Sequence, residues 1–293
     1  MEKKSIETVV SDVYKLMKDK NSSKGVDPEA EIEKFGEAMK DLMRKEFLPG
    51  ERIFTSSNKL RLSAIGKPAR QQWMSARNYT GEKFTAATLI KFMFGHMSEE
   101  FLLMLVRMSG HEVTDEQKRV EVGGVVGHMD CKIDGEVVDV KTASPFGFKK
   151  FQDGTMAASD SFGYVAQLKA YAHAEGVRKW SWLAMDKQNG SLALLEYDLD
   201  NENDPMYDNY NEDIVELVES VKTAVAGDEM PEQCAFPVPE GKSGNMKLPT
   251  LCSYCKYKKH CYPTLRAFAY STGPKFLTEV KELPRVNEID LDF

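Results

Sequence analysis

The chain has 293 residues, of which 42% are hydrophobic and 10% aromatic, enough to build one large domain or a core with an appendage. Its net charge of −7 argues against a general nucleic-acid coat protein. The opening MEKKSIETVV lacks an apolar signal segment and an Arg-rich presequence, and charged residues interrupt the most apolar run, 84–106. We therefore expect a cytoplasmic protein with no membrane span.

Positive charge is concentrated in two segments. Residues 52–81 and 241–278 contain lysines and arginines but no acidic residue, whereas residues 196–232 are strongly acidic. The basic segments could form a track for a polyanion, or they could simply be solvated faces, and charge alone does not choose. Aromatic residues lie among the basic ones and favour nucleic acid, since their rings can stack on bases: Trp73, Tyr79, Tyr254, Tyr257 and Tyr262.

Helices are predicted for the first third of the chain. Residues 2–20 and 27–47 are amphipathic, Asp27-Pro28 is a typical helix start, and we expect the pair to form a packing hairpin that ends at Pro49-Gly50. A basic, partly irregular segment follows at 51–81. Residues 84–108 predict a long helix, apolar on most sides and therefore central, in which Gly95 suggests close packing. His96, Glu99 and Glu100 can share a face of this helix, either as a satisfied hydrogen bond or as functional groups.

A strand meander is predicted next, at residues 117–122, 125–133 and 136–142. Asp134-Gly135 favours a two-residue type I′ turn, and that turn would set Asp130 directly opposite Asp139, with His128 and Lys141 on the same face. Facing carboxylates repel, so they need a cation or a proton. The alternative is a surface hairpin whose polar residues face water, but the buried character of VVDVK opposes it. The hairpin therefore indicates a site for a hard divalent metal.

The remaining elements complete an α/β arrangement with a mixed sheet. We expect a helix that places Gln167 and Tyr171 on one face, and a strand hairpin around Asn189-Gly190. The predicted helices and hairpin occupy residues 145–153, 161–176, 179–198 and 213–226. Residues 201–211 read as an acidic linker, the chain from 229 onward as loop-rich, and the acidic end VNEIDLDF as a disordered tail or, alternatively, a docking peptide for a protein partner.

Four of the five cysteines lie in that loop-rich region. Cys252-x2-Cys255-x5-Cys261, together with Cys234, has a spacing typical of metal ligands, and ligand count suits zinc and an iron–sulfur cluster equally. His260 offers a further zinc ligand. Cys131 is left over, and we expect it to be buried on the opposite face of the hairpin.

The pattern Asp130, then Asp139-x-Lys141, resembles the signature of the PD-(D/E)XK nucleases. Gly95-His96-x-x-Glu99 and Gln167-x-x-x-Tyr171 resemble the flanking motifs of the RecB-like and lambda-exonuclease-like branch. The resemblance covers residues 84–198 and implies a restriction-endonuclease-like core at 83–200, with a central mixed sheet flanked by helices. It divides the chain into an N-terminal helical and basic segment at 1–82, this core, and a helix with a four-cysteine clamp and an acidic tail at 201–293.

The resemblance also implies roles for single residues. Glu99, His96, Asp130, Asp139 and the carbonyl of Val140 would bind one or two Mg²⁺ or Mn²⁺ ions, with Glu100 as the alternative to Glu99. Lys141 would be the catalytic lysine, and Gln167 and Tyr171 would hold DNA or the active-site network. The resemblance favours a 4Fe–4S cluster on the cysteines, with structural zinc as the alternative. Because no cysteine precedes the core, the fourth ligand would be Cys234.

The function that the resemblance implies is metal-dependent hydrolysis of phosphodiester bonds at DNA ends by an exonuclease. The compactness of the chain suggests that a phage or mobile element encodes it. The enzyme would then act in recombination, replication or DNA degradation in the host cytoplasm. The alternatives are an endonuclease on the same core and a non-catalytic DNA-binding module with a zinc clamp. The expected partner is DNA, and the sequence does not choose between single- and double-stranded ends. An oligomer is compatible with the sequence.

Overall fold

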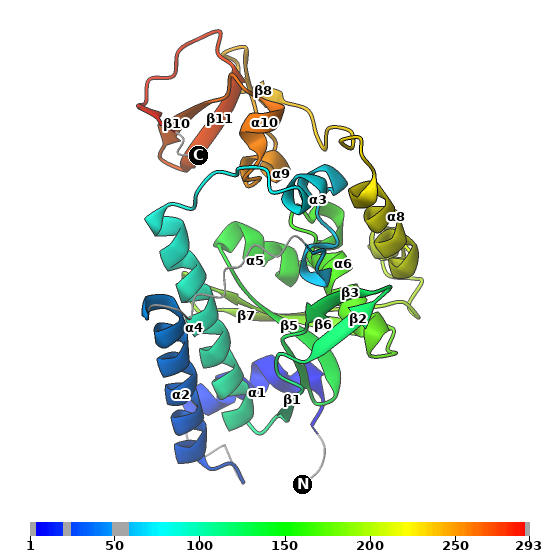
Figure 1. The fold of residues 1–293 in the computed structure, drawn as a ribbon. Coiled ribbons are helices and arrows are strands. Elements are labelled where there is room, and N and C mark those ends of the chain that lie inside the picture. The colour runs from blue at the N-terminus through cyan, green and yellow to red at the C-terminus, as the bar shows by residue number, and fades with distance from the viewer. Residues whose placement is uncertain (1–3, 20–24, 49–58, 291–293) are drawn as a thin grey trace.

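The computed structural model describes residues 4–19, 25–48 and 59–290 (Figure 1). Its centre is a five-stranded sheet in the order β1-β4-β5-β6-β7, in which β5 and β6 are parallel and the other neighbours antiparallel. These strands are β1 Val113–Thr114, β4 Cys131–Ile133, β5 Glu136–Ala143, β6 Lys179–Asp186 and β7 Leu192–Asp198. Helices cover both faces (Figure 1). The predicted α/β class, with a central mixed sheet flanked by helices, is confirmed.

One face of the sheet is covered by the start of the chain and by the long helix. Ile6, Val9 and Val13 pack with Leu102 and Val106 against the sheet. The elements are the short helix η1 Ile6–Thr8, α1 Val9–Lys18 and α4 Ala86–Met108. Helix α2, Pro28–Phe47, begins at Asp27, whose carboxylate caps the first turn, and it packs on the outer side of α4. The expected α1–α2 hairpin is therefore wrong: each helix packs chiefly on α4.

The other face carries the larger core. The connection from β5 to the parallel strand β6 runs through α5 and α6, as a crossover between parallel strands requires. Trp180 and Trp182 of β6 are fully buried there against Tyr197 and Tyr210. The covering elements are η3 Leu62–Ala64, α5 Pro145–Gln152, η4 Ala157–Ser159, α6 Tyr164–Ala174, α7 Tyr207–Tyr210 and α8 Ile214–Ala226.

The predicted meander divides between two sheets. β2 Arg119–Val122 and β3 Val125–His128 form a separate two-stranded sheet, and the chain leaves it at Met129 to enter β4. Met129 is buried in the larger core, and a side chain at Gly127 would collide with Tyr171 and Leu62. His128 is exposed and lies opposite Arg119, so its predicted place beside Asp139 is wrong.

Helix α4 is buried over only part of its length. Leu102, Leu103 and Val106 are in the core, but the first half is exposed, with Ile90 65% exposed. No neighbouring atom lies within 4 Å of a side chain built at Gly95. The expectation that α4 is central throughout, with Gly95 in close packing, is therefore wrong. Among the described residues, no helix is apolar over a length that would span a membrane.

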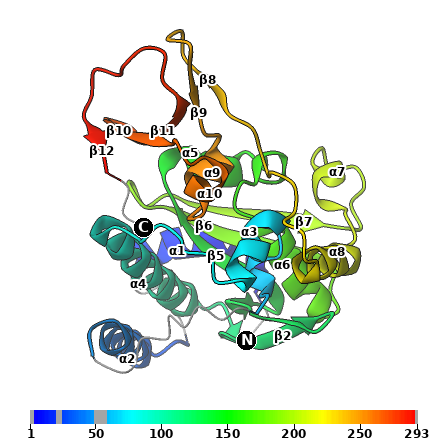
Figure 2. The same ribbon diagram turned by 45° about the horizontal axis from the view of Figure 1, so that its top comes forward.

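The C-terminal part holds a second five-stranded sheet, in the order β12-β10-β11-β9-β8, where the sequence predicts loops (Figure 2). Between its strands lie two short helices, and α3 lies beside them (Figure 1). β12 pairs with β10, so the predicted disorder of the tail is wrong for these residues. The elements are α3 Ala69–Ala76, β8 Val238–Glu240, β9 Asn245–Lys247, α9 Thr250–Ser253, α10 Lys258–Cys261, β10 Arg266–Tyr270, β11 Gly273–Glu279 and β12 Glu288–Ile289.

Three predictions fall partly outside the described residues: the extreme ends of the first helix, the stop at Pro49-Gly50, and the basic segment from Arg52 to residue 58. The last three residues of the chain also lie outside them.

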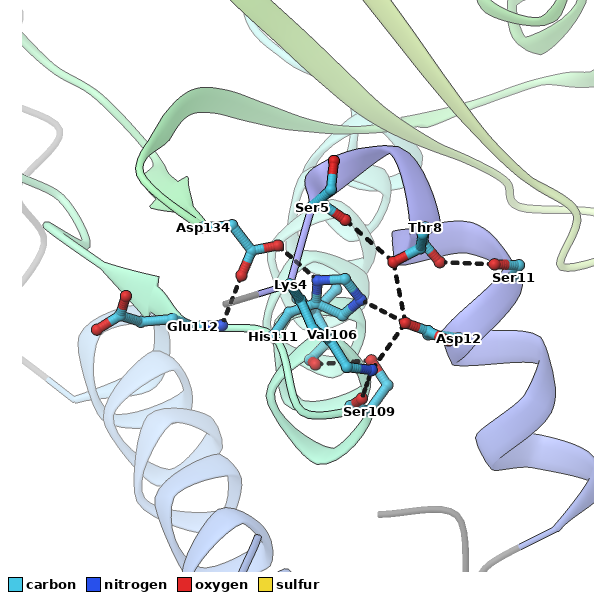
Figure 3. Close-up of polar contacts among 10 residues, drawn as sticks. All are labelled: Lys4, Ser5, Thr8, Ser11, Asp12, Val106, Ser109, His111, Glu112 and Asp134. Carbon is cyan, nitrogen blue, oxygen red and sulfur yellow. Dashed lines mark hydrogen bonds and ion pairs between the residues drawn. The ribbon is translucent and has the colours of Figure 1, made fainter. Parts of the chain in front are cut away.

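The turn between β4 and β5 is the predicted type I′ turn, with φ of 53° at Asp134 and 92° at Gly135. Asp134 is itself buried. Its carboxylate lies 2.6 Å from Nδ1 of His111 and accepts the backbone N–H of Glu112 at 3.0 Å (Figure 3). The other ring nitrogen of His111 lies 3.2 Å from Asp12 of α1. A turn residue thus ties β4 to the segment after α4 and, through His111, to α1.

Replacing Asp134 tests this tie. Asp134→Ala should lower the free energy of unfolding by about 2–4 kcal/mol, because it leaves the buried ring of His111 and the backbone N–H of Glu112 without their partner. Asp134→Asn retains an acceptor and the turn preference, so it should cost clearly less. Urea denaturation of both variants measures the difference, and equal losses would contradict the role of the side-chain contacts.

Lys169 links α6 to the segment before α8. Its ammonium donates to the carbonyl of Tyr210 at 2.6 Å and to that of Glu212, and burial lowers its pKa to about 8. The unfolded chain holds this proton up to a pKa of about 10.4. The folded protein releases it first as the pH rises.

The stability of the protein relative to Lys169→Met should therefore increase between about pH 8 and pH 10, since the cost of the buried charge disappears in that range. Urea denaturation at several pH values gives the two unfolding free energies. A constant difference between the two proteins would show that the Lys169 ammonium does not titrate there.

Candidate active site

Strand β5 and helix α6 bring four of the predicted residues together. Asp139 is 1% exposed, and its Oδ1 accepts a hydrogen bond from Nε2 of Gln167 at 3.3 Å. The same nitrogen lies 3.4 Å from the hydroxyl of Tyr171, one turn further along α6. Nζ of Lys141 is 2.6 Å from Oδ2 of Asp139, yet this oxygen is buried without a hydrogen bond of regular geometry. The pair thus joins a fully buried carboxylate to a largely buried ammonium.

Asp130 stands beside this pair. The β4–β5 register sets Cys131 opposite Val138 as predicted, and the carboxylate of Asp130 accepts the backbone N–H of Val140 at 3.0 Å. Burial raises the pKa of Asp139 to about 7; Lys141 opposes this shift and Asp130 adds to it. The carboxylates Asp139 and Asp130 hold the pKa of Lys141 above its ordinary value, although burial alone would lower it. At neutral pH Lys141 is therefore the cation of the group.

Helix α4 adds Glu99 to the carboxylates. Burial, and next the charge of Asp130, raises the pKa of Glu99 to about 8. Glu100 faces elsewhere: burial and then Glu116 raise its pKa. His96 is exposed, and the carboxylate whose pKa it lowers is Glu100. The structure thus brings Glu99 to Asp130 and leaves His96 and Glu100 outside the group. Their predicted roles as ligands remain predictions.

The carboxylate group fits a hard divalent cation by its chemistry. Burial and mutual repulsion raise the pKa values of Glu99 and Asp139, and Oδ2 of Asp139 meets the Lys141 ammonium without a hydrogen bond of regular geometry. Within residues 4–19, 25–48 and 59–290, no three His, Cys, Asp or Glu side chains converge closely enough to hold one ion. Mg²⁺ does not require such a set, since it is commonly held by one or two carboxylates, waters and substrate phosphates. Two of these carboxylates with Lys141 nearby satisfy that requirement.

Tyr164 is part of this site, and the sequence analysis missed it. Its ring centroid lies 5.0 Å from Nζ of Lys141. The ring of Phe162 stacks on that of Tyr164, with the two centroids 5.4 Å apart. The only signal in the sequence is an aromatic pair at the start of α6. Nothing local indicates that the pair faces Lys141, because that depends on the crossover from β5.

The cysteine segment, residues 234–261, forms a second candidate site. Cys234, Cys252, Cys255 and Cys261 are unpaired and line one pocket, together with Pro68 and Gln71 at the start of α3. Burial raises the pKa of Cys252 to about 11, and the three other thiols add to the shift. The structure therefore gathers the four predicted cysteines in one place.

Cations surround this pocket. Arg70 lowers the pKa of Cys234, and Lys256 lowers that of Cys255, each against the effect of burial. Lys67 also lies there: burial and then the charge of Lys256 lower its pKa, while Cys255 opposes them. Lys67 and Lys256 come from the two basic segments of the sequence, which thus meet at the cysteines.

Two other predictions about the cysteines have clear outcomes. Nε2 of His260 lies 2.6 Å from the carbonyl of Thr80, and His260 does not line the pocket, so its predicted part as an alternative zinc ligand is not supported. Cys131 is fully buried in the core on the α1–α4 side, and burial raises its pKa well above its ordinary value. Its predicted burial is confirmed.

The cysteine segment is anchored on the N-terminal part of the chain. Tyr257 packs with Trp73 and Met74 of α3, and the buried ammonium of Lys258 pairs with Glu82. The backbone N–H of Glu82 also donates to the carbonyl of Lys256 at 2.8 Å. The segment that leads into α4 is thereby fixed to the cysteines.

No protein-family profile matches the sequence, and no curated protein is significantly similar to it. Fifteen chains of solved structures match the fold in part, among them the three described next. The crystal structure of SSO0001 has 14% sequence identity and a TM-score of 0.38, covering 75% of this chain and 93% of that chain. LHK-Exo in complex with dAMP has 11% identity and a TM-score of 0.36, over 58% of this chain and 91% of that chain.

A second structure of LHK-Exo, an alkaline exonuclease from Laribacter hongkongensis, has 12% identity and a TM-score of 0.33, covering 55% of this chain and 91% of that chain. At these scores the likenesses carry no argument about this protein.

Proposed function

We propose that this protein is a metal-dependent deoxyribonuclease of the PD-(D/E)XK type, acting on DNA ends. The observation that carries the proposal is the buried pair of Asp139 and Lys141 with Asp130 and Glu99 beside it. A buried carboxylate group with one lysine is costly to stability, so it is expected where it serves a chemical purpose. The motifs of the sequence supply the reaction class.

Each residue has a definite task in this proposal. Two of the three carboxylates Asp130, Asp139 and Glu99 would hold each Mg²⁺ or Mn²⁺ ion, and the carbonyl of Val140 is a further candidate ligand. The bound ion would lower the pKa of a water and offset charge on the phosphate. Lys141, cationic at neutral pH, would orient the attacking water and stabilise negative charge on the phosphoryl oxygens. Nε2 of Gln167 would orient the carboxylate of Asp139, and the hydroxyl of Tyr171 accepts a hydrogen bond from the same nitrogen.

The finer part of the proposal is that the enzyme is an exonuclease serving recombination, replication or degradation of DNA in a phage or mobile element. Support for this comes from the resemblance of its motifs to the RecB-like and lambda-exonuclease-like branch. DNA is the proposed partner. The positive charges of Lys67 and Lys256, which lie beside the cysteines, also suit the phosphates of a DNA backbone.

The cysteine segment is proposed to hold a 4Fe–4S cluster. The support is the resemblance of the motifs, together with the four thiols that line one pocket. Four thiolates match the ligand count of such a cluster and also that of zinc, which is the alternative. Lys67, Arg70 and Lys256 suit the negative charge of the cluster.

Substitution of the buried pair tests the nuclease. Asp139→Asn and Lys141→Met should each lower hydrolysis of end-labelled linear DNA in Mg²⁺ or Mn²⁺ by at least about 100-fold, because the first removes a carboxylate that binds the ion and the second removes the cation that stabilises charge on the phosphate. Lys149→Ala, which removes an exposed lysine of α5, should leave the rate unchanged. Covalently closed circular DNA should resist the enzyme if it acts on ends.

Two results would overturn this proposal. The nuclease reading fails if the protein does not degrade DNA with either ion, or if Lys141→Met retains the full rate. Cleavage of closed circles at the rate of linear DNA would replace the exonuclease by an endonuclease.

Protein purified without oxygen tests the cluster. It should contain about four iron and four sulfide per chain and absorb broadly near about 400 nm. Cys252→Ser should remove the iron and the absorbance, whereas Cys131→Ala should retain both, because Cys131 lies in the α1–α4 core. A colourless protein with one zinc per chain would overturn the cluster in favour of a zinc site.

A further inference from the structure

Three aromatic rings form a continuous row that begins at Lys141. The Lys141 ammonium lies 5.0 Å from the centroid of the Tyr164 ring. Phe162 stacks on Tyr164 with an interplanar angle of 25°, and Tyr254 meets Phe162 edge-on at 5.3 Å between centroids. Tyr164 is the first residue of α6 and Phe162 lies in the turn just before it, whereas Tyr254 belongs to the cysteine segment. The row therefore joins the two candidate sites.

The row is open to solvent at its outer end. Tyr254 is 72% exposed and Phe162 39% exposed, while Tyr164, nearest to Lys141, is half-buried. Large exposed rings cost solubility and gain nothing from a core, so two of them in contact, beside a buried ion pair, indicate a binding surface. The rings offer flat faces for stacking, and Lys141 offers a cation at their inner end.

The backbone holds Phe162 in place before any ligand arrives. Asp160 accepts the backbone N–H groups of Phe162, Gly163 and Val165 at 2.8–3.0 Å. Gly163 has φ of 78°, and a Cβ on it would lie 2.5 Å from the backbone of Gly66. This contact allows only glycine at residue 163 and clamps the turn against the segment before α3. The ring position is therefore set by the fold.

We propose that Phe162 and Tyr254 are a stacking site for a nucleobase of the DNA strand whose phosphodiester lies at Lys141. The proposal rests on the nuclease function and adds the part of the substrate that this surface binds. A base stacked at the outer end of the row, with a phosphate paired to Lys141 at the inner end, would lay one strand along the row. Such stacking is open only to an unpaired base, so the strand at the site is single-stranded there. Because Tyr254 lies between Cys252 and Cys255, the cysteine segment places one of the two rings.

Binding of a single-stranded oligonucleotide tests the site apart from hydrolysis. The probe is an oligothymidylate carrying one 2-aminopurine, titrated with full-length protein in EDTA, where hydrolysis cannot proceed. Phe162→Ala and Tyr254→Ala should each weaken binding by at least about fivefold and relieve the fluorescence quenching that stacking causes. Phe162→Trp should restore both. Phe236→Ala removes a ring of the C-terminal part that is as exposed as Tyr254 but does not belong to the row, and it should change neither.

An abasic oligonucleotide separates stacking from a structural effect of the substitution. Removing the base at the position that Phe162 contacts should weaken binding by the unaltered protein by the same factor as Phe162→Ala does on intact DNA. On abasic DNA, Phe162→Ala and the unaltered protein should then bind equally well. The site is overturned if Phe162→Ala binds and quenches like the unaltered protein while that protein still degrades DNA, or if the variant loses the same factor on abasic DNA. Failure to bind or degrade any DNA would overturn both this site and the nuclease function, and a surface for an apolar peptide would then be the remaining use of the row.

Discussion

The buried charge of Asp139 constrains much of this molecule. A carboxylate that is 1% exposed cannot be stabilised by water, so its neighbours must provide the compensation. Lys141 does so from the same strand, and Gln167 from α6. The three-residue arrangement holds only if the β5–β6 crossover sets α6 over this end of β5. The packing of Trp180 and Trp182 beneath that crossover thus serves the electrostatics of the site.

Asp130 and Glu99 make the same region costly. They add negative charge beside Asp139, and the raised pKa values of Asp139 and Glu99 express that cost. A protein gains no stability from this crowding, and a cation would relieve it. The half-exposed helix α4 fits the same picture. Its C-terminal half packs in the core, and Glu99 lies where the helix leaves the core.

The cysteine segment is joined to this region rather than appended to it. Tyr257 packs on α3, Glu82 meets Lys258, and Tyr254 reaches Phe162 at the start of α6. Loss of order in the segment would therefore move one wall of the candidate active site. The close contact of Gly66 with Gly163 ties the same wall from the N-terminal side.

Local chemistry in the sequence determined the start of α2 at Asp27-Pro28, the Asp134-Gly135 turn, the β4–β5 register and hence the meeting of Asp130 with Asp139, because each depends on residues a few positions apart. The tertiary structure alone decided that β3 leaves the meander, that a second sheet forms after residue 237, that Glu99 rather than Glu100 approaches Asp130, and that Tyr164 faces Lys141. These outcomes depend on contacts between segments far apart in the chain, and hydrophobic periodicity carries no information about which distant partner a face will meet.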